Sequence, residues 1–181
     1  MRRWRRSRQN RFMSNEETFL KFSCEKLTEL EGRIETCVAK LTPEQIWMRG
    51  AENDNAVGNL VLHLAGNVRQ WIICGVGGAE DRRDRDSEFG ARSGEDAVER
   101  LGAAVSEAVE VLRGLPHATL QEQRSIQKHW DLTVLEAIYH VVEHFSMHTG
   151  QIIFATKLLT GTDLGFYGFL KPAGVGGEKK P

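Results

Sequence analysis

The chain has 181 residues, of which 40% are apolar, and carries a formal charge of −1 at pH 7. This length and composition allow one domain with its own hydrophobic core, and no uninterrupted apolar run reaches the roughly 18 residues of a membrane-spanning helix. Three widely spaced cysteines without a Cys-x-x-Cys pair are typical of reduced thiols, so we expect a cytoplasmic protein with no membrane partner.

The N-terminal segment is strongly basic, with six arginines within residues 1–12 and a second methionine at Met13. No apolar stretch follows, which argues against a cleaved export signal. Residues 1–13 are predicted to be a disordered extension; a nucleic-acid or membrane arm and a true start at Met13 are the alternatives. Without these arginines the rest of the chain carries about −7, so we expect no nucleic-acid surface on the folded body.

Two long helices and a short turn are predicted in the first half of the chain. Ser14-Asn-Glu-Glu17 is a capping box, and the apolar spacing that follows predicts a helix over about 15–41. Thr42-Pro-Glu-Gln45 predicts a short helical turn. Asp54 or Asn55 can cap a second long helix, whose apolar residues share one face until Gly75 ends it.

The second half begins with a Gly-rich, charged stretch over 75–93 that has no period and is predicted to be a long loop, of the kind that is usually functional or mobile. A third helix follows from Ser93 to Pro116, and a fourth, capped by Thr133-Val-Leu-Glu136, runs to about Thr160. Between them, a short extended piece could lie around 124–126. These elements predict an all-α four-helix bundle, a fold in which facing helices commonly build metal sites, and residues 171–181 are predicted to form a flexible tail.

Histidines carry the strongest chemical signal. His140, His144 and His148 recur at four-residue steps, which places them on one stripe of the fourth helix with neighbouring Cβ atoms about 5–6 Å apart. Two imidazoles one turn apart can share a metal ion, and on a helical wheel His144 and His148 lie closer to the apolar face than His140. His63 of the second helix is the candidate third ligand. The alternative is that all of them are ordinary boundary residues.

Three blocks resemble the DinB/YfiT-like superfamily of small bacterial metalloproteins, in order over about residues 14–170. These are Asn59-Leu-Val-Leu-His63-Leu-Ala-Gly-Asn67, Arg83-Asp-Arg-Asp-Ser-Glu-Phe89 and His144-Phe-Ser-Met-His148-Thr-Gly-Gln151. The resemblance implies a four-helix bundle, usually a homodimer, that binds one divalent metal ion through His63, His144 and His148. Many relatives have arginine after the last ligand, whereas this chain has Thr149, so no substrate-binding role of that arginine carries over.

Three neutral imidazoles would leave the ion an open position, as in catalytic sites. We expect zinc, with nickel or iron as alternatives. Because the superfamily includes thiol-dependent transferases and isomerases, we expect transfer of a low-molecular-weight thiol to a small electrophile. The alternatives are a metal-dependent hydrolase, a non-catalytic or stress-related dimeric metal-binding protein, and a helical interaction module with incidental histidines.

Further polar residues could support such a site. Asn67 and Gln151 lie about one turn beyond predicted ligands and could orient an imidazole or a bound water, unless they simply face solvent. Arg83, Arg85 and Glu88 could bring a substrate-clamping loop over the metal, with a solvated charge cluster as the alternative reading.

Overall fold

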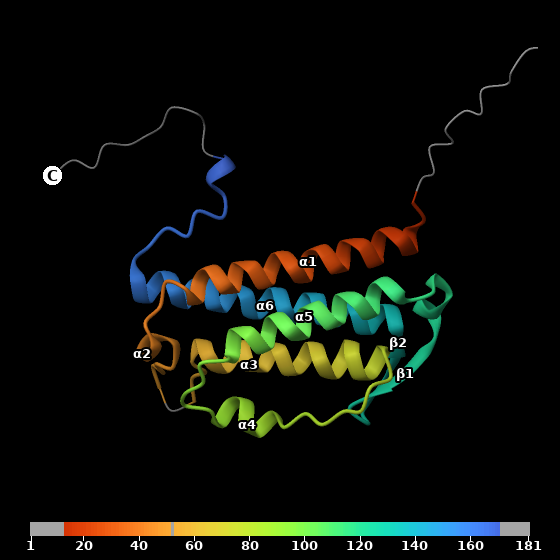
Figure 1. Ribbon diagram of the computed structural model, residues 1–181, viewed down its shortest axis with the longest axis horizontal. Coiled ribbons are helices and arrows are strands. Elements are labelled where there is room, and N and C mark those ends of the chain that lie inside the picture. Colours follow the sequence, from red (N-terminus) through yellow and green to blue (C-terminus); the bar gives the residue numbers. More distant parts are fainter. Residues whose placement is uncertain (1–12, 52, 171–181) are drawn as a thin grey trace, which may run out of the picture.

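The structure of the protein is a computed structural model that describes residues 13–51 and 53–170. Four long helices dominate it and lie side by side: α1 (Asn15–Val38), α3 (Val57–Val68), α5 (Ala97–Gly114) and α6 (Val134–Thr160) (Figure 1). In this arrangement α1 packs against α5 and α6, and α3 packs against the same two helices. The predicted tail at 171–181, and the predicted basic extension apart from Met13, lie outside the described residues.

The hydrophobic core fills the space between the four long helices. Each helix contributes fully buried side chains, among them Leu27, Ile34, Leu64, Leu101 and Phe145. Burial of such a side chain contributes about 1.5–3 kcal/mol, so the apolar stripes predicted from helical spacing supply the main driving force for the bundle. None of the helices in the described part of the chain combines the length and the apolar composition that a membrane crossing requires.

Three of the predicted helix starts are confirmed by their caps, but the predicted cap of the second long helix at Asp54 or Asn55 is wrong, because α3 begins after Ala56, whose amide is bound by the Asn59 side chain. Ser14 Oγ accepts the amide of Glu17 at 3.1 Å, and the Glu17 carboxylate accepts the amide of Ser14 at 3.0 Å. Thr42 and Thr133 form the same reciprocal box at α2 (Pro43–Ile46) and α6. At the other end of α6, Gly161 adopts φ +64°, a conformation that favours glycine and stops the helix.

The all-α prediction needs one correction, because β1 (Gln123–Ile126) and β2 (Trp130–Thr133) form an antiparallel hairpin that leads into α6 (Figure 1). Its turn holds Gln127 and Lys128 at φ +56° and +59°. The hairpin is kept in place by Ile126, which is buried and lies over Gly75. Two further short segments are 3₁₀-helical, His117–Gln121 and Gly168–Leu170.

Two departures from the predicted elements lie next to the histidines. The second long helix changes at Arg69 into a π-helical segment, Arg69–Val76, in which five of eight residues are buried. The stretch predicted as a loop over 75–93 contains a short helix, α4 (Arg85–Gly90), capped by Asp84, whose carboxylate accepts the Ser87 amide at 3.1 Å. α4 packs against α3 and so brings the loop to the helix that carries His63.

Candidate metal centre

Three histidine side chains converge between α3 and α6. His63 Nε2 lies 3.2 Å from His144 Nε2, and His148 Nε2 lies 3.2 Å from the same atom. Metal–nitrogen bonds of about 2.0–2.1 Å around a tetrahedral ion place two ligand nitrogens about 3.3 Å apart. Each of the three residues offers one ligand atom within 4.8 Å of the others, and within residues 13–51 and 53–170 no other group of His, Cys, Asp and Glu does so. These three histidines could therefore hold a metal ion.

Two of the three rings, those of His144 and His148, lie in a setting that keeps them neutral and so suits them to bind a cation. Burial, reinforced by the neighbouring imidazoles of His148 and His63, lowers the pKa of His144 to about 3. Burial also lowers the pKa of His148. Neutral imidazole is the form that donates a nitrogen lone pair to a metal ion, so no proton needs to be displaced from His144 or His148 at neutral pH.

His63 is oriented by a buried carboxylate. Its Nδ1 lies 3.2 Å from Glu88 Oε2, and Nε2 faces the other two imidazoles. Arg83 Nη2 lies 3.0 Å from the same Nδ1 atom. In the tautomer that suits a metal ligand, Nδ1 carries the proton and donates it to Glu88, an arrangement typical of metal-binding histidines. This carboxylate, at the end of the predicted charged loop, is 7% exposed.

Arg83 holds Glu88 in place with two hydrogen bonds. Its Nε donates to Glu88 Oε1 and its Nη2 to Oε2, both at 2.7 Å. Burial raises the pKa of the Glu88 carboxyl, but the hydrogen bonds from Arg83 and His63 outweigh it and the pKa lies below its usual value. Glu88 is therefore an anion when it faces His63, and Arg83 compensates its charge.

The other predicted residues take different places. Gln151 Oε1 lies 2.6 Å from His148 Nδ1, so it can accept the proton of that ring as Glu88 does for His63. Asn67 is 4% exposed and makes no hydrogen bond within the described residues. Arg85 is exposed, with its guanidinium 5.4 Å from the centre of the Phe89 ring. His140 stays outside the group of three and lies against the Trp71 ring at 4.1 Å between centroids.

Sequence reasoning gave no role to Asn59, which anchors α4 to α3. Its Nδ2 donates to the backbone oxygens of Glu88 at 2.9 Å and Ala91 at 3.0 Å, while its Oδ1 accepts from Arg49 Nη2 at 2.8 Å. The side chain is fully buried. Asn59 lies one turn before His63, and this four-residue spacing of polar residues on an apolar helix was the available signal.

A glycine makes room for the Arg83–Glu88 pair. A Cβ at Gly66 would collide with Glu88 Oε1 and lie 2.8 Å from Arg83 Nε, whereas a Cβ at the helical Gly150 would meet nothing within 4 Å. We expect Gly66→Ala to lower the free energy of unfolding by about 1–3 kcal/mol, as overpacking does. Gly150→Ala should raise it by about 0.5–1 kcal/mol. Urea unfolding of both variants checks this, and a change of the same sign in both would contradict it.

The lowered pKa of His144, about 3, predicts that the metal-free protein loses stability in acid. The unfolded chain takes up this proton near pH 6.5 and the folded chain only near pH 3, so between these values the unfolded state binds more protons and stability falls as the pH falls. The free energy of unfolding from urea titrations at pH 7 and pH 5 should show this decrease. His144→Phe should reduce it, and the same change at the exposed His129 should not; an equal pH dependence in all three proteins would refute the prediction.

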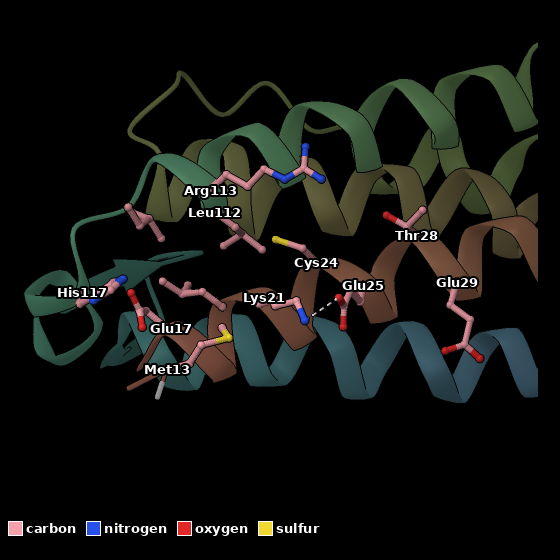
Figure 2. A pocket seen from close by; sticks show the side chains of 12 residues that line it. Met13, Glu17, Lys21, Cys24, Glu25, Thr28, Glu29, Leu112, Arg113 and His117 are labelled. Carbon is pink, nitrogen blue, oxygen red and sulfur yellow. Dashed lines mark ion pairs between the residues drawn. The ribbon is translucent and has the colours of Figure 1, made fainter. Parts of the chain in front are cut away.

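Two hollows border the histidines. One of about 210 Å³ is lined by His63 and His144, and another of about 520 Å³ by His148 together with apolar side chains such as Leu60 and Phe154. A larger hollow of about 760 Å³ lies between α1 and α5, where Figure 2 shows Cys24 and Leu112 together with the Lys21–Glu25 ion pair. None of the three clustered histidines lines that larger hollow, so we place the candidate site at the two smaller ones.

The fold and the cluster define a mostly helical protein with a three-histidine group that could hold a metal ion. Residues 14–168 match the family described as protein of unknown function (DUF1572), and the chain belongs to this family. A solved structure, the crystal structure of the conserved protein of locus from Enterococcus faecalis, is similar with a TM-score of 0.66 and 18% identity, over 78% of this chain and 97% of that chain. No curated protein sequence is similar enough to count as a match.

Proposed function

We propose that this protein is a metal-dependent enzyme of the DinB/YfiT-like type, which binds one divalent ion through His63, His144 and His148 and transfers a low-molecular-weight thiol to a small electrophile. The observation that carries the proposal is the convergence of three Nε2 atoms from two helices. The Nε2 atom of His144 lies 3.2 Å from that of His63 and 3.2 Å from that of His148. Similarity in fold alone would not support this reaction, because one fold can carry many functions.

We propose zinc as the bound ion, with nickel or iron as alternatives, because imidazole is a suitable ligand for all three metals. A divalent ion bound by these three imidazoles would keep its charge and would stabilise a thiolate at neutral pH. The chain contributes orientation, because Glu88 and Gln151 lie where they can accept an Nδ1 proton from His63 and His148. In the transfer, the thiol loses its proton to solvent, the carbon–sulfur bond forms, and the leaving group departs with the electron pair of the broken bond.

The proposal is tested on untagged protein. Metal content per chain is measured first, and glutathione, cysteine and N-acetylcysteine are then each incubated with monochlorobimane before and after removal of the metal by a chelator. We expect about one metal ion per chain and conjugation that is lost with the metal and restored by zinc. One metal ion per chain without metal-dependent conjugation would leave a binding protein and overturn the transferase proposal. Ester cleavage by the loaded protein, in place of conjugation, would favour the hydrolase.

We also propose the homodimer that the superfamily resemblance implies. Exposed apolar side chains lie on one face of α6, where Met147, Phe154 and Leu158 are 55%, 70% and 75% exposed. Such a face is typical of a helix that packs against a partner. A molar mass in solution of one chain, 20.4 kDa, would refute this part of the proposal.

A further inference from the structure

The hollow of about 210 Å³ beside the histidines has a lining of its own. His63 and His144 form part of its wall, so any molecule inside it would lie next to a metal ion held by these ligands. The rest of its lining includes Asn67, Trp71, Arg85, Gln127, Trp130 and His140. These residues come from α3, the π-helical segment, α4, the hairpin and α6, and they meet only in the folded chain.

Besides the Nδ1 atom of His144, two buried polar groups in this lining lack partners. Asn67 is 4% exposed, and within the described residues its amide makes no hydrogen bond. Trp71 is 3% exposed, and its Nε1 is likewise buried without an acceptor in that part of the chain. Buried polar groups are nearly always satisfied, by the protein, by water or by a ligand. Two unsatisfied groups in the wall of one hollow therefore point to a molecule with polar atoms of its own.

The charged side chains in the lining indicate the charge of that molecule. No acidic residue is among the described residues that line it. Arg83 is neutralised by Glu88, whereas Arg85 makes no hydrogen bond or ion pair in the described structure and contacts only the face of Phe89. With a divalent ion bound by the histidines, the guanidinium at one side and the ion at the other would create a positive field in a small space. An anion is the ligand that this field favours.

We propose that the hollow binds a small carboxylate with a flat apolar body, and that this is the electrophilic substrate. Arg85 takes the carboxylate in the two-pronged manner that its planar group allows. The rings of Trp71 and Trp130 face the flat body, and Asn67 bonds to the polar atom nearest the metal. The inference rests on the proposed function, because the same ion would activate the thiol that attacks this substrate.

The test is a calorimetric titration of the metal-loaded, full-length protein with benzoate, and with benzamide as the uncharged analogue of the same shape. We expect benzoate to bind and benzamide to bind at least tenfold more weakly. Arg85→Gln should weaken benzoate binding at least tenfold. The matched control is Arg82→Gln, which removes the same charge from an arginine that is 80% exposed and paired with Glu80; it should change the affinity less than twofold.

Three results would overturn the inference: no benzoate binding, equal binding of benzoate and benzamide, or equal effects of the two arginine variants. The conjugation assay with monochlorobimane separates this outcome from failure of the transferase. If benzoate binds through Arg85 but no conjugate forms, the carboxylate site stands and the transferase proposal falls. If conjugates form but benzoate neither binds nor inhibits, the reverse holds.

Discussion

Replacing His148 with alanine is expected to lower the affinity for zinc by about a thousandfold. Structural zinc sites bind with about 10–16 kcal/mol, so one ligand in three or four contributes several kcal/mol. The Nε2 atom of His148 lies 3.2 Å from that of His144, and no neighbouring carboxylate or thiol in the described structure belongs to the same group of ligands. Competition with a chelating indicator gives the affinity, and metal analysis of the purified variant gives the stoichiometry.

The chain supplies a matched control in His140, two turns earlier on the same helix. Its ring lies against Trp71 and its centroid is 5.8 Å from that of His144, outside the converging group. His140→Ala should keep the metal affinity within a few-fold of the original protein, even where loss of the ring contact reduces stability. Equal metal loss in both variants, or full metal content in His148→Ala, would refute the three-histidine assignment.

The contrast between these two histidines could be predicted from the sequence because it depends only on helical geometry. Positions four residues apart share a face, and the apolar residues of the same helix show which way that face points. His63 was the candidate third ligand from the sequence, the resemblance supported the same choice, and its ring lies beside that of His144 in the structure. The caps were equally accessible, since Ser14 and Thr133 form their boxes with residues three positions away.

The hairpin could not be predicted in the same way. Turn positions with positive φ usually carry Asn or Gly, whereas the three-residue turn between Ile126 and Trp130 has Gln127 and Lys128 there. Burial of Ile126 over Gly75 and the pairing of Gln123 with Thr133 are contacts that the sequence does not reveal locally. The π-helical segment that begins at Arg69 could not be predicted from the sequence either, because α- and π-helical segments bury nearly the same apolar residues.

The role of the charged loop was the feature of the site that the sequence predicted least well. Residues 81–88 mix acidic and basic side chains, and the pattern alone does not tell which carboxylate is buried and which are solvated. Glu88 is the buried carboxylate because Asn59 holds α4 against α3 and because Gly66 leaves space for its side chain. Both residues are distant in sequence from the loop. Only the folded chain brings these determinants together.

Glu88→Ala is therefore expected to have the second large effect, on stability and on metal binding together. The variant leaves the Arg83 guanidinium buried without its anion, and breaking one side of a buried ion pair costs about 3–5 kcal/mol. It also removes the acceptor of His63 Nδ1, and loss of such a partner typically lowers metal affinity by about 10–100-fold. Urea unfolding and chelator competition measure the two effects separately.

The control is Glu80→Ala, which breaks an exposed pair with Arg82 and should cost no more than about 1 kcal/mol, with no change in metal affinity. If Glu88→Ala destabilised the protein but bound zinc as tightly as before, Glu88 would be a structural partner of Arg83 with no part in orienting His63.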